Sequence, residues 1–139
     1  MTREEKNLEK LLKVAAATSD ERRRHVANLE AALASAQTSR DWLKQTASAE
    51  SNAVWSAENP NLYSLQSYMG GVEEKSRALD ATCERLTREI DDARAELADA
   101  FREVKKIEHL LEVRRKTAQK NKSRRATAQS TEMATRVVR

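Results

Sequence analysis

The residues best placed for chemistry in this 139-residue chain are basic, and they gather near its C-terminal end. Residues 113–139 hold nine Lys or Arg residues against one acidic residue, Glu132. Residues 1–112 hold 17 basic and 21 acidic residues, so the net charge of +4 conceals a strongly basic end. Such a segment favours nucleic acid, acidic lipid or an acidic protein cavity. It lacks aromatic residues for base stacking or membrane anchoring, which favours a protein partner.

Two alternatives to a binding role stay open for the basic residues. The Ser, Thr and Gln content after Asn121 is also typical of a frayed, solvated tail. The earlier run Arg22–His25 follows Asp20 and Glu21, and it is better explained as a solvated helix face than as a nucleic-acid patch.

Aromatic residues form a second candidate binding group. Trp55, Tyr63 and Tyr68 lie outside the apolar repeat described below, and exposed aromatic side chains often anchor interfaces. We group Val72 with them. The alternative is that the three aromatic rings only cover one end of a helix pair.

Nothing in the sequence indicates catalysis, a cofactor or a metal. There is no glycine-rich phosphate loop and no nucleophile near a base. The single Cys83 excludes an intramolecular disulfide, and His25 and His109 lack companion ligands. No apolar run is long enough for a signal sequence or a membrane span, so we expect a cytoplasmic protein that is not an enzyme.

Helices must position these side chains, because the chain is 35% charged and has only two Gly and one Pro. Apolar or small residues recur at alternating steps of four and three, which is the a/d pattern of a heptad repeat. They are Leu79, Cys83, Leu86, Ile90, Ala93, Leu97, Ala100, Val104, Ile107, Leu111 and Ala118. We call such a stripe an apolar seam; it is buried only against another helix, in a left-handed supercoil.

A weaker seam of the same period comes first in the chain. Its a positions are Leu12, Ser19, Val26, Leu33, Arg40 and Ala47, and its d positions are Leu8, Ala15, Arg22, Leu29, Ala36 and Leu43. The polar members either fix the register or loosen the pair. Thr2 and Glu5 fit a capping box, so a helix is predicted over about 3–53.

The strongest helix-breaking signals surround the single proline. We expect a turn over about 54–59 and a second helix over about 60–125, with Asn59 as its N-cap and Pro60 in its first position. Within that helix, Gly70-Gly71 is expected to be a weak point rather than the turn.

These elements predict an all-α fold, in which two long helices form an antiparallel coiled-coil hairpin with unequal arms. The hairpin is expected to be one domain over 1–139, with residues 113–139 as a basic tail beyond the reach of the first helix. With the turn centred near Ser56, the expected pairs are Leu43–Met69, Leu33–Leu79, Leu29–Cys83, Val26–Leu86 and Leu8–Val104. A shift by one heptad is the alternative.

The second helix and the tail resemble a known family. Residues 100–112, AFREVKKIEHLLE, followed by a basic segment with Glu132-Met133-Ala134, are similar to the FliJ family of coiled-coil proteins of the bacterial flagellar type III export apparatus. Injectisome stalk proteins share the plan and are the alternative.

The resemblance implies a stalk, similar in shape to the rotor stalk of rotary ATPases. One end enters the central hole of the export ATPase hexamer, the other engages the large membrane subunit of the export gate, and some members escort empty export chaperones. The implied ATPase contacts are Arg114, Arg115, Lys116, Lys120, Lys122, Arg124 and Arg125, and the implied gate contacts are Trp55, Tyr63, Tyr68 and Val72. The implied location is the cytoplasm beside the inner-membrane export apparatus, with no membrane insertion and no nucleic acid partner.

Overall fold

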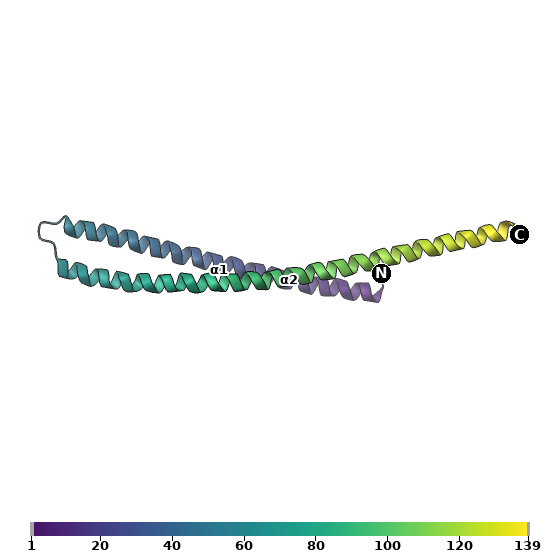
Figure 1. The fold of residues 1–139 in the computed structure, drawn as a ribbon, viewed down its shortest axis with the longest axis horizontal. Helices are drawn as coiled ribbons and strands as arrows, with labels where there is room; N and C mark the ends of the chain where they lie inside the picture. The colour runs from purple at the N-terminus through teal and green to yellow at the C-terminus, as the bar shows by residue number, and fades with distance from the viewer. Residues whose placement is uncertain (1, 139) are drawn as a thin grey trace. The chain divides into compact units, whose positions relative to one another are not determined.

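The computed structural model describes residues 2–138, and helices account for nearly all of them. Helix α1 spans Arg3–Trp55 and helix α2 spans Leu62–Val138, with lengths of 53 and 77 residues (Figure 1). A short connection, residues 56–61, joins them. The predicted all-α fold of two long helices is confirmed.

The first turn of α1 forms as the capping pattern predicts. The backbone amide of Glu5 donates a hydrogen bond to Thr2 Oγ1 at 3.2 Å, which satisfies one of the amides that a helix start leaves without a partner. The backbone amide of Lys6 donates to the carbonyl of Thr2 at 3.1 Å and so begins the helical ladder. The hydroxyl half of the expected capping box is therefore confirmed.

Helix α2 begins two residues later than predicted. Asn61, rather than Asn59, is the N-cap, because its side-chain oxygen accepts a hydrogen bond from the Ser64 amide at 3.1 Å. The Leu65 amide donates to the Asn61 carbonyl at 3.1 Å, which closes the first turn. Asn59 and Asn61 have equal capping chemistry, so the sequence alone did not distinguish them. Pro60 lies in the connection, where its missing N–H leaves no ladder bond unmade.

Helix α2 also ends later than the predicted limit near residue 125. No Gly or Pro follows Gly71, so no residue forces the helix to stop. Thr127, Thr131 and Thr135 each donate a side-chain hydrogen bond to the carbonyl four residues earlier, at 2.9–3.0 Å. These residues turn their polar groups back onto the helix. The expectation that Gly70-Gly71 lies within a continuous helix is confirmed.

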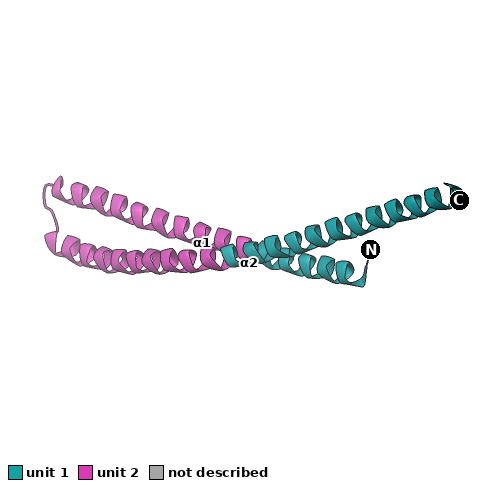
Figure 2. Ribbon diagram, turned by 45° about the vertical axis from the view of Figure 1, so that its right-hand side comes forward, with its two compact units in different colours: residues 1–21, 97–139 teal, residues 22–96 magenta. Residues whose placement is uncertain are grey.

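The contacts divide the chain into two compact units (Figure 2). The first, which we call the terminal unit, combines residues 1–21 and 97–139, and the second, the connection unit, comprises residues 22–96. In each unit a segment of α1 packs against a segment of α2.

The connection unit buries the predicted seam. Its buried apolar side chains are Val26, Ala47, Val72, Cys83, Leu86, Ile90 and Ala93. All of them fall at a or d positions of the heptad repeats, and Cys83 is 7% exposed, as expected of a small packed residue. The seam therefore places the apolar core between the two helices.

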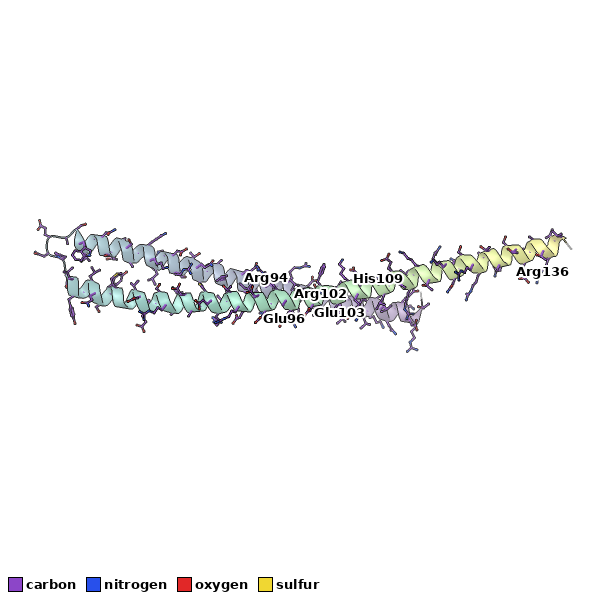
Figure 3. The ribbon with its side chains drawn as sticks, viewed as in Figure 1. Arg94, Glu96, Arg102, Glu103, His109 and Arg136 are labelled. Carbon is purple, nitrogen blue, oxygen red and sulfur yellow. The ribbon has the colours of Figure 1, made fainter. Side chains whose placement is uncertain are left out.

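Ion pairs across the connection unit show the register of its helices. Arg94 Nη2 lies 2.8 Å from Glu30 Oε1, Arg22 Nη1 lies 2.8 Å from Glu96 Oε2, and Arg40 Nη1 lies 3.5 Å from Asp80 Oδ1. Arg94 and Glu96 are labelled on α2 in Figure 3. The midpoints of these pairs fall between residues 59 and 62, whereas the prediction centred the turn near Ser56.

The predicted set of pairs is therefore wrong by one heptad, and the alternative register is the one observed. It sets Leu33 at the level of Leu86 rather than Leu79. A groove lined by both Leu43 and Leu79 agrees with this shift. The observed bounds change in the same direction, because α1 ends at Trp55 and α2 begins at Leu62, each two residues later than predicted.

The polar members of the α1 seam behave differently from one another. Arg22 is exposed and reaches Glu96, so it leaves the seam. Arg40 is half-buried; its guanidinium contacts Asp80 and Asp41, while its Nε is buried with no hydrogen-bond partner. Ser19, in the terminal unit, is 5% exposed. Polar seam positions of this kind lower the stability of a coiled coil and help to specify its register.

Candidate functional site

The basic segment is an exposed stretch of helix α2. In the terminal unit, Leu111 is 3% exposed and is the last buried residue of α2 that the structure describes. Every described residue after it is exposed, up to Val138. Arg136 is labelled on this stretch in Figure 3. The structure therefore exposes the predicted basic residues, but α1 still reaches the first of them: Arg114 pairs with Glu4 and Arg115 with Glu9, so the expectation that the basic tail lies beyond the reach of the first helix is wrong at its start.

Three of the predicted ATPase contacts are already engaged in ion pairs within the terminal unit. Arg114 pairs with Glu4, and Arg115 Nη2 lies 3.0 Å from Glu9 Oε1. Lys116 Nζ lies 3.0 Å from Glu112 Oε1, one turn earlier on α2. This ammonium group lowers the pKa of the Glu112 carboxyl through a hydrogen bond and charge attraction.

The other four predicted contacts are Lys120, Lys122, Arg124 and Arg125, and none of them forms an ion pair with residues 2–138. At ~100° of rotation per residue, Lys120 and Arg124 share one side of α2 while Lys122 and Arg125 lie on the opposite side. Positive charge therefore surrounds the helix instead of marking a single face. A flat acidic surface would contact the basic side chains on only one side of the helix.

The aromatic group surrounds the connection, in the unit of residues 22–96. Trp55 is the last residue of α1 and is 63% exposed, and Tyr63, in the first turn of α2, is 84% exposed. Tyr68 is further along α2 and is 39% exposed. Val72 is 9% exposed and belongs to the buried seam, so it supports the helix pair rather than presenting a surface.

Trp42 is an exposed aromatic residue that the sequence reasoning missed. It is 64% exposed and lines an apolar groove between the helices, together with Leu43, Ala78 and Leu79 and with Thr38, Ser39 and Lys75. In the heptad pattern Trp42 and Tyr68 occupy c and g positions, which share one side of a helix pair. A tryptophan outside the seam of a chain with few aromatic residues was the available signal.

Within residues 2–138, no three His, Cys, Asp or Glu side chains come together in an arrangement that could hold a metal ion. Neither α1 nor α2, as far as the structure describes them, contains a stretch apolar and long enough to cross a membrane.

Comparison with known proteins gives one result. A family model described as "Flagellar FliJ protein" matches residues 4–139. No curated protein and no solved structure matches the chain. The family model covers both helices, the aromatic group and the whole basic segment, so the chain belongs to the FliJ family of flagellar proteins.

Proposed function

We propose that this chain is a non-enzymatic stalk of the flagellar type III export apparatus, and that it joins the export ATPase hexamer to the large membrane subunit of the export gate. Membership of the FliJ family supports a role in flagellar export. A paired-helix protein with a distinct group of exposed side chains in each unit is suited to contacting two partners. The proposed location is the cytoplasm, at the periphery of the inner-membrane apparatus.

The observation that carries the ATPase role is the exposed basic stretch of α2. Its seam burial ends at Leu111, and the helix continues to Val138 with positive charge on opposite sides. A ring that encloses the helix can contact both Lys120 and Lys122 at once, which a flat surface cannot. We therefore assign Lys120, Lys122, Arg124 and Arg125 as the main ATPase contacts, with Arg114, Arg115 and Lys116 nearer the helix pair.

The aromatic group is the proposed contact to the export gate. Trp55, Tyr63 and Tyr68 expose large apolar surfaces, which favours them as anchors in an interface. The groove beside Trp42 extends this surface along the connection unit. Val72 contributes by holding α1 and α2 together under the exposed rings. Escort of empty export chaperones is a further proposed role, for which the family resemblance is the support.

The experiment is to mix the purified chain with a purified export ATPase and, separately, with duplex DNA. We expect faster ATP turnover and more ring assembly, because the stalk stabilises the hexamer. A shortened chain ending at Glu112 keeps Leu111 and the buried seam, so we expect it to retain its helical signal and lose the stimulation. Full stimulation by the shortened chain at low salt would contradict the assignment. Tight, salt-dependent DNA binding without stimulation would favour the nucleic-acid alternative instead.

A further inference from the structure

Two ion pairs stand where the buried seam of the terminal unit ends. Glu4 and Glu9 of α1 hold Arg114 and Arg115 of α2, just beyond the buried Leu111. The four side chains are between 37% and 67% exposed, so water and salt reach both pairs. The first turns of α1 are thus attached to α2 partly through charge.

The apolar side chains of this part of α1 are only partly buried. Between Glu5 and Ser19, no described residue of α1 is fully buried; Leu8, Leu12 and Ala15 are half-buried. The two fully buried residues at the borders of the stretch are themselves polar, at 8% exposure for Glu5 and 5% for Ser19. Residues 3–18 therefore contribute no deeply buried apolar side chain of their own, and their apolar contact with α2 consists of half-buried side chains that line grooves with Ile107 and Leu111.

An acidic partner must compete with α1 for two of the seven basic residues. Glu4 and Glu9 present the same carboxylate groups that an acidic protein surface would present to Arg114 and Arg115. Exposed ion pairs have small energies that salt screens, so exchanging one carboxylate for another is nearly balanced. The outcome then depends on how many carboxylates the partner brings.

We propose that residues 3–18 act as an ion-pair latch: Glu4 and Glu9 withhold Arg114 and Arg115 from acidic surfaces, and a partner that takes these arginines releases the segment from α2. This inference deepens the proposed function and rests on it, because it concerns the regulation of the same basic residues. The latch makes basal binding to scattered acidic surfaces weak. It opens only for a partner that supplies several carboxylates together.

The first test measures opening of the segment without any partner. In the Glu4→Gln/Glu9→Gln variant we expect backbone amides of residues 7–18 to exchange hydrogen about threefold to tenfold faster than in the parent chain. High salt should accelerate exchange in the parent and have little effect on the variant. The charge-swapped Glu4→Arg/Arg114→Glu variant reverses one pair and keeps the Glu9–Arg115 pair, so it should exchange about as slowly as the parent. Exchange that is equal in the parent and the glutamine variant would overturn the proposal.

The second test measures access to the arginines with poly-L-glutamate as the probe. We expect Glu4→Gln/Glu9→Gln to bind the polymer more tightly than the parent, on the order of threefold at low salt. The Glu50→Gln/Glu58→Gln variant changes the net charge equally at two exposed residues of the connection unit and serves as the control. Equal gains in both variants would show a general charge effect and overturn the latch.

Neither measurement uses the export ATPase, so the latch and the proposed ATPase-binding function can be refuted independently of each other. If the glutamine variant shows faster exchange and tighter polymer binding but the chain does not bind the ATPase, the latch is supported and the proposed partner is wrong. If the chain stimulates the ATPase but all variants show the same amide exchange and the same poly-L-glutamate binding, the proposed function is supported and the latch is wrong.

Discussion

Arg94 Nη2 lies 2.8 Å from Glu30 Oε1, and this contact between α2 and α1 shows the register of the connection unit. At ~1.5 Å per residue, the heptad by which the predicted register was wrong corresponds to about 10 Å along the helix axis. The levels of Leu33 and Leu86 therefore coincide, whereas those of Leu33 and Leu79 do not.

Cysteine crosslinking tests this register. In a Cys83→Ala background, Leu33→Cys/Leu86→Cys should form a disulfide readily under mild oxidation, because the two seam positions face each other. Leu33→Cys/Leu79→Cys is the matched control and should crosslink slowly, since disulfide geometry does not span a further heptad. Preferential crosslinking of the control pair would restore the originally predicted register.

The paired glycines of α2 are a site where stability can be raised. A Cβ placed at Gly70 or Gly71 meets nothing within 4 Å, so Ala fits without moving a neighbour. Each of Gly70→Ala and Gly71→Ala should increase the free energy of unfolding by about 0.5–1 kcal/mol, measured by urea denaturation. Ala81→Gly, at an exposed position of the same helix, should lower it by a similar amount. A decrease for either Gly→Ala variant would indicate that this point of the helix must bend.

Glu112 gives a pH-dependent contact in the terminal unit. Lys116 keeps the pKa of Glu112 below its ordinary value in the folded chain. The stabilisation is therefore present above the ordinary pKa of a glutamate, and it is lost as the pH falls through the lowered pKa. A carbon-detected NMR titration of the Glu112 carboxyl should show the lowered pKa, and Lys116→Gln should return it toward the ordinary value. An unchanged titration in Lys116→Gln would mean that Lys116 is not the cause.

The proposed gate contact depends on the exposed aromatic rings. Tyr68→Ala should weaken binding to the isolated cytoplasmic part of the gate subunit by about tenfold, as expected for an aromatic anchor, and leave helicity and ATPase stimulation unchanged. Phe101→Ala removes an exposed ring of the other unit, at 46% exposure, and should leave gate binding unchanged. Unchanged affinity in Tyr68→Ala would count against this role for the aromatic group.

Most of the fold could be predicted from the sequence, because the spacing of apolar residues along each helix decides which side chains are buried. The a and d positions from Val26 to Ala47, and from Val72 to Leu111, are buried or half-buried as predicted. The register was predicted less well, because a one-heptad shift still places a positions against d positions and changes only which residues share a layer and which charges meet. The Asn59-Pro60-Asn61 run also offers two caps of equal chemistry, so the sequence left the start of α2 open by two residues.

The residue types of the candidate site could be predicted from the sequence, but which of its side chains already form ion pairs could not. Clustering of charge after Glu112 indicated the basic segment, but heptad spacing gave no sign that Glu4 and Glu9 neutralise two of its arginines. That contact depends on the register, which the sequence left open. Trp42 was missed because heptad spacing separates seam positions from outer positions and does not indicate which outer positions border a groove.

The most direct test of the account neutralises the four basic residues that have no ion pair with residues 2–138. The variant Lys120→Gln/Lys122→Gln/Arg124→Gln/Arg125→Gln keeps the full chain and every buried seam residue. The matched control, Arg24→Gln/Lys44→Gln/Arg88→Gln/Lys106→Gln, removes the same charge at exposed positions of both helices. In an ATP turnover assay at low salt with the purified export ATPase, the account predicts that the first variant loses stimulation by about tenfold or more and that the control stimulates like the parent chain. Full stimulation by the first variant would contradict it.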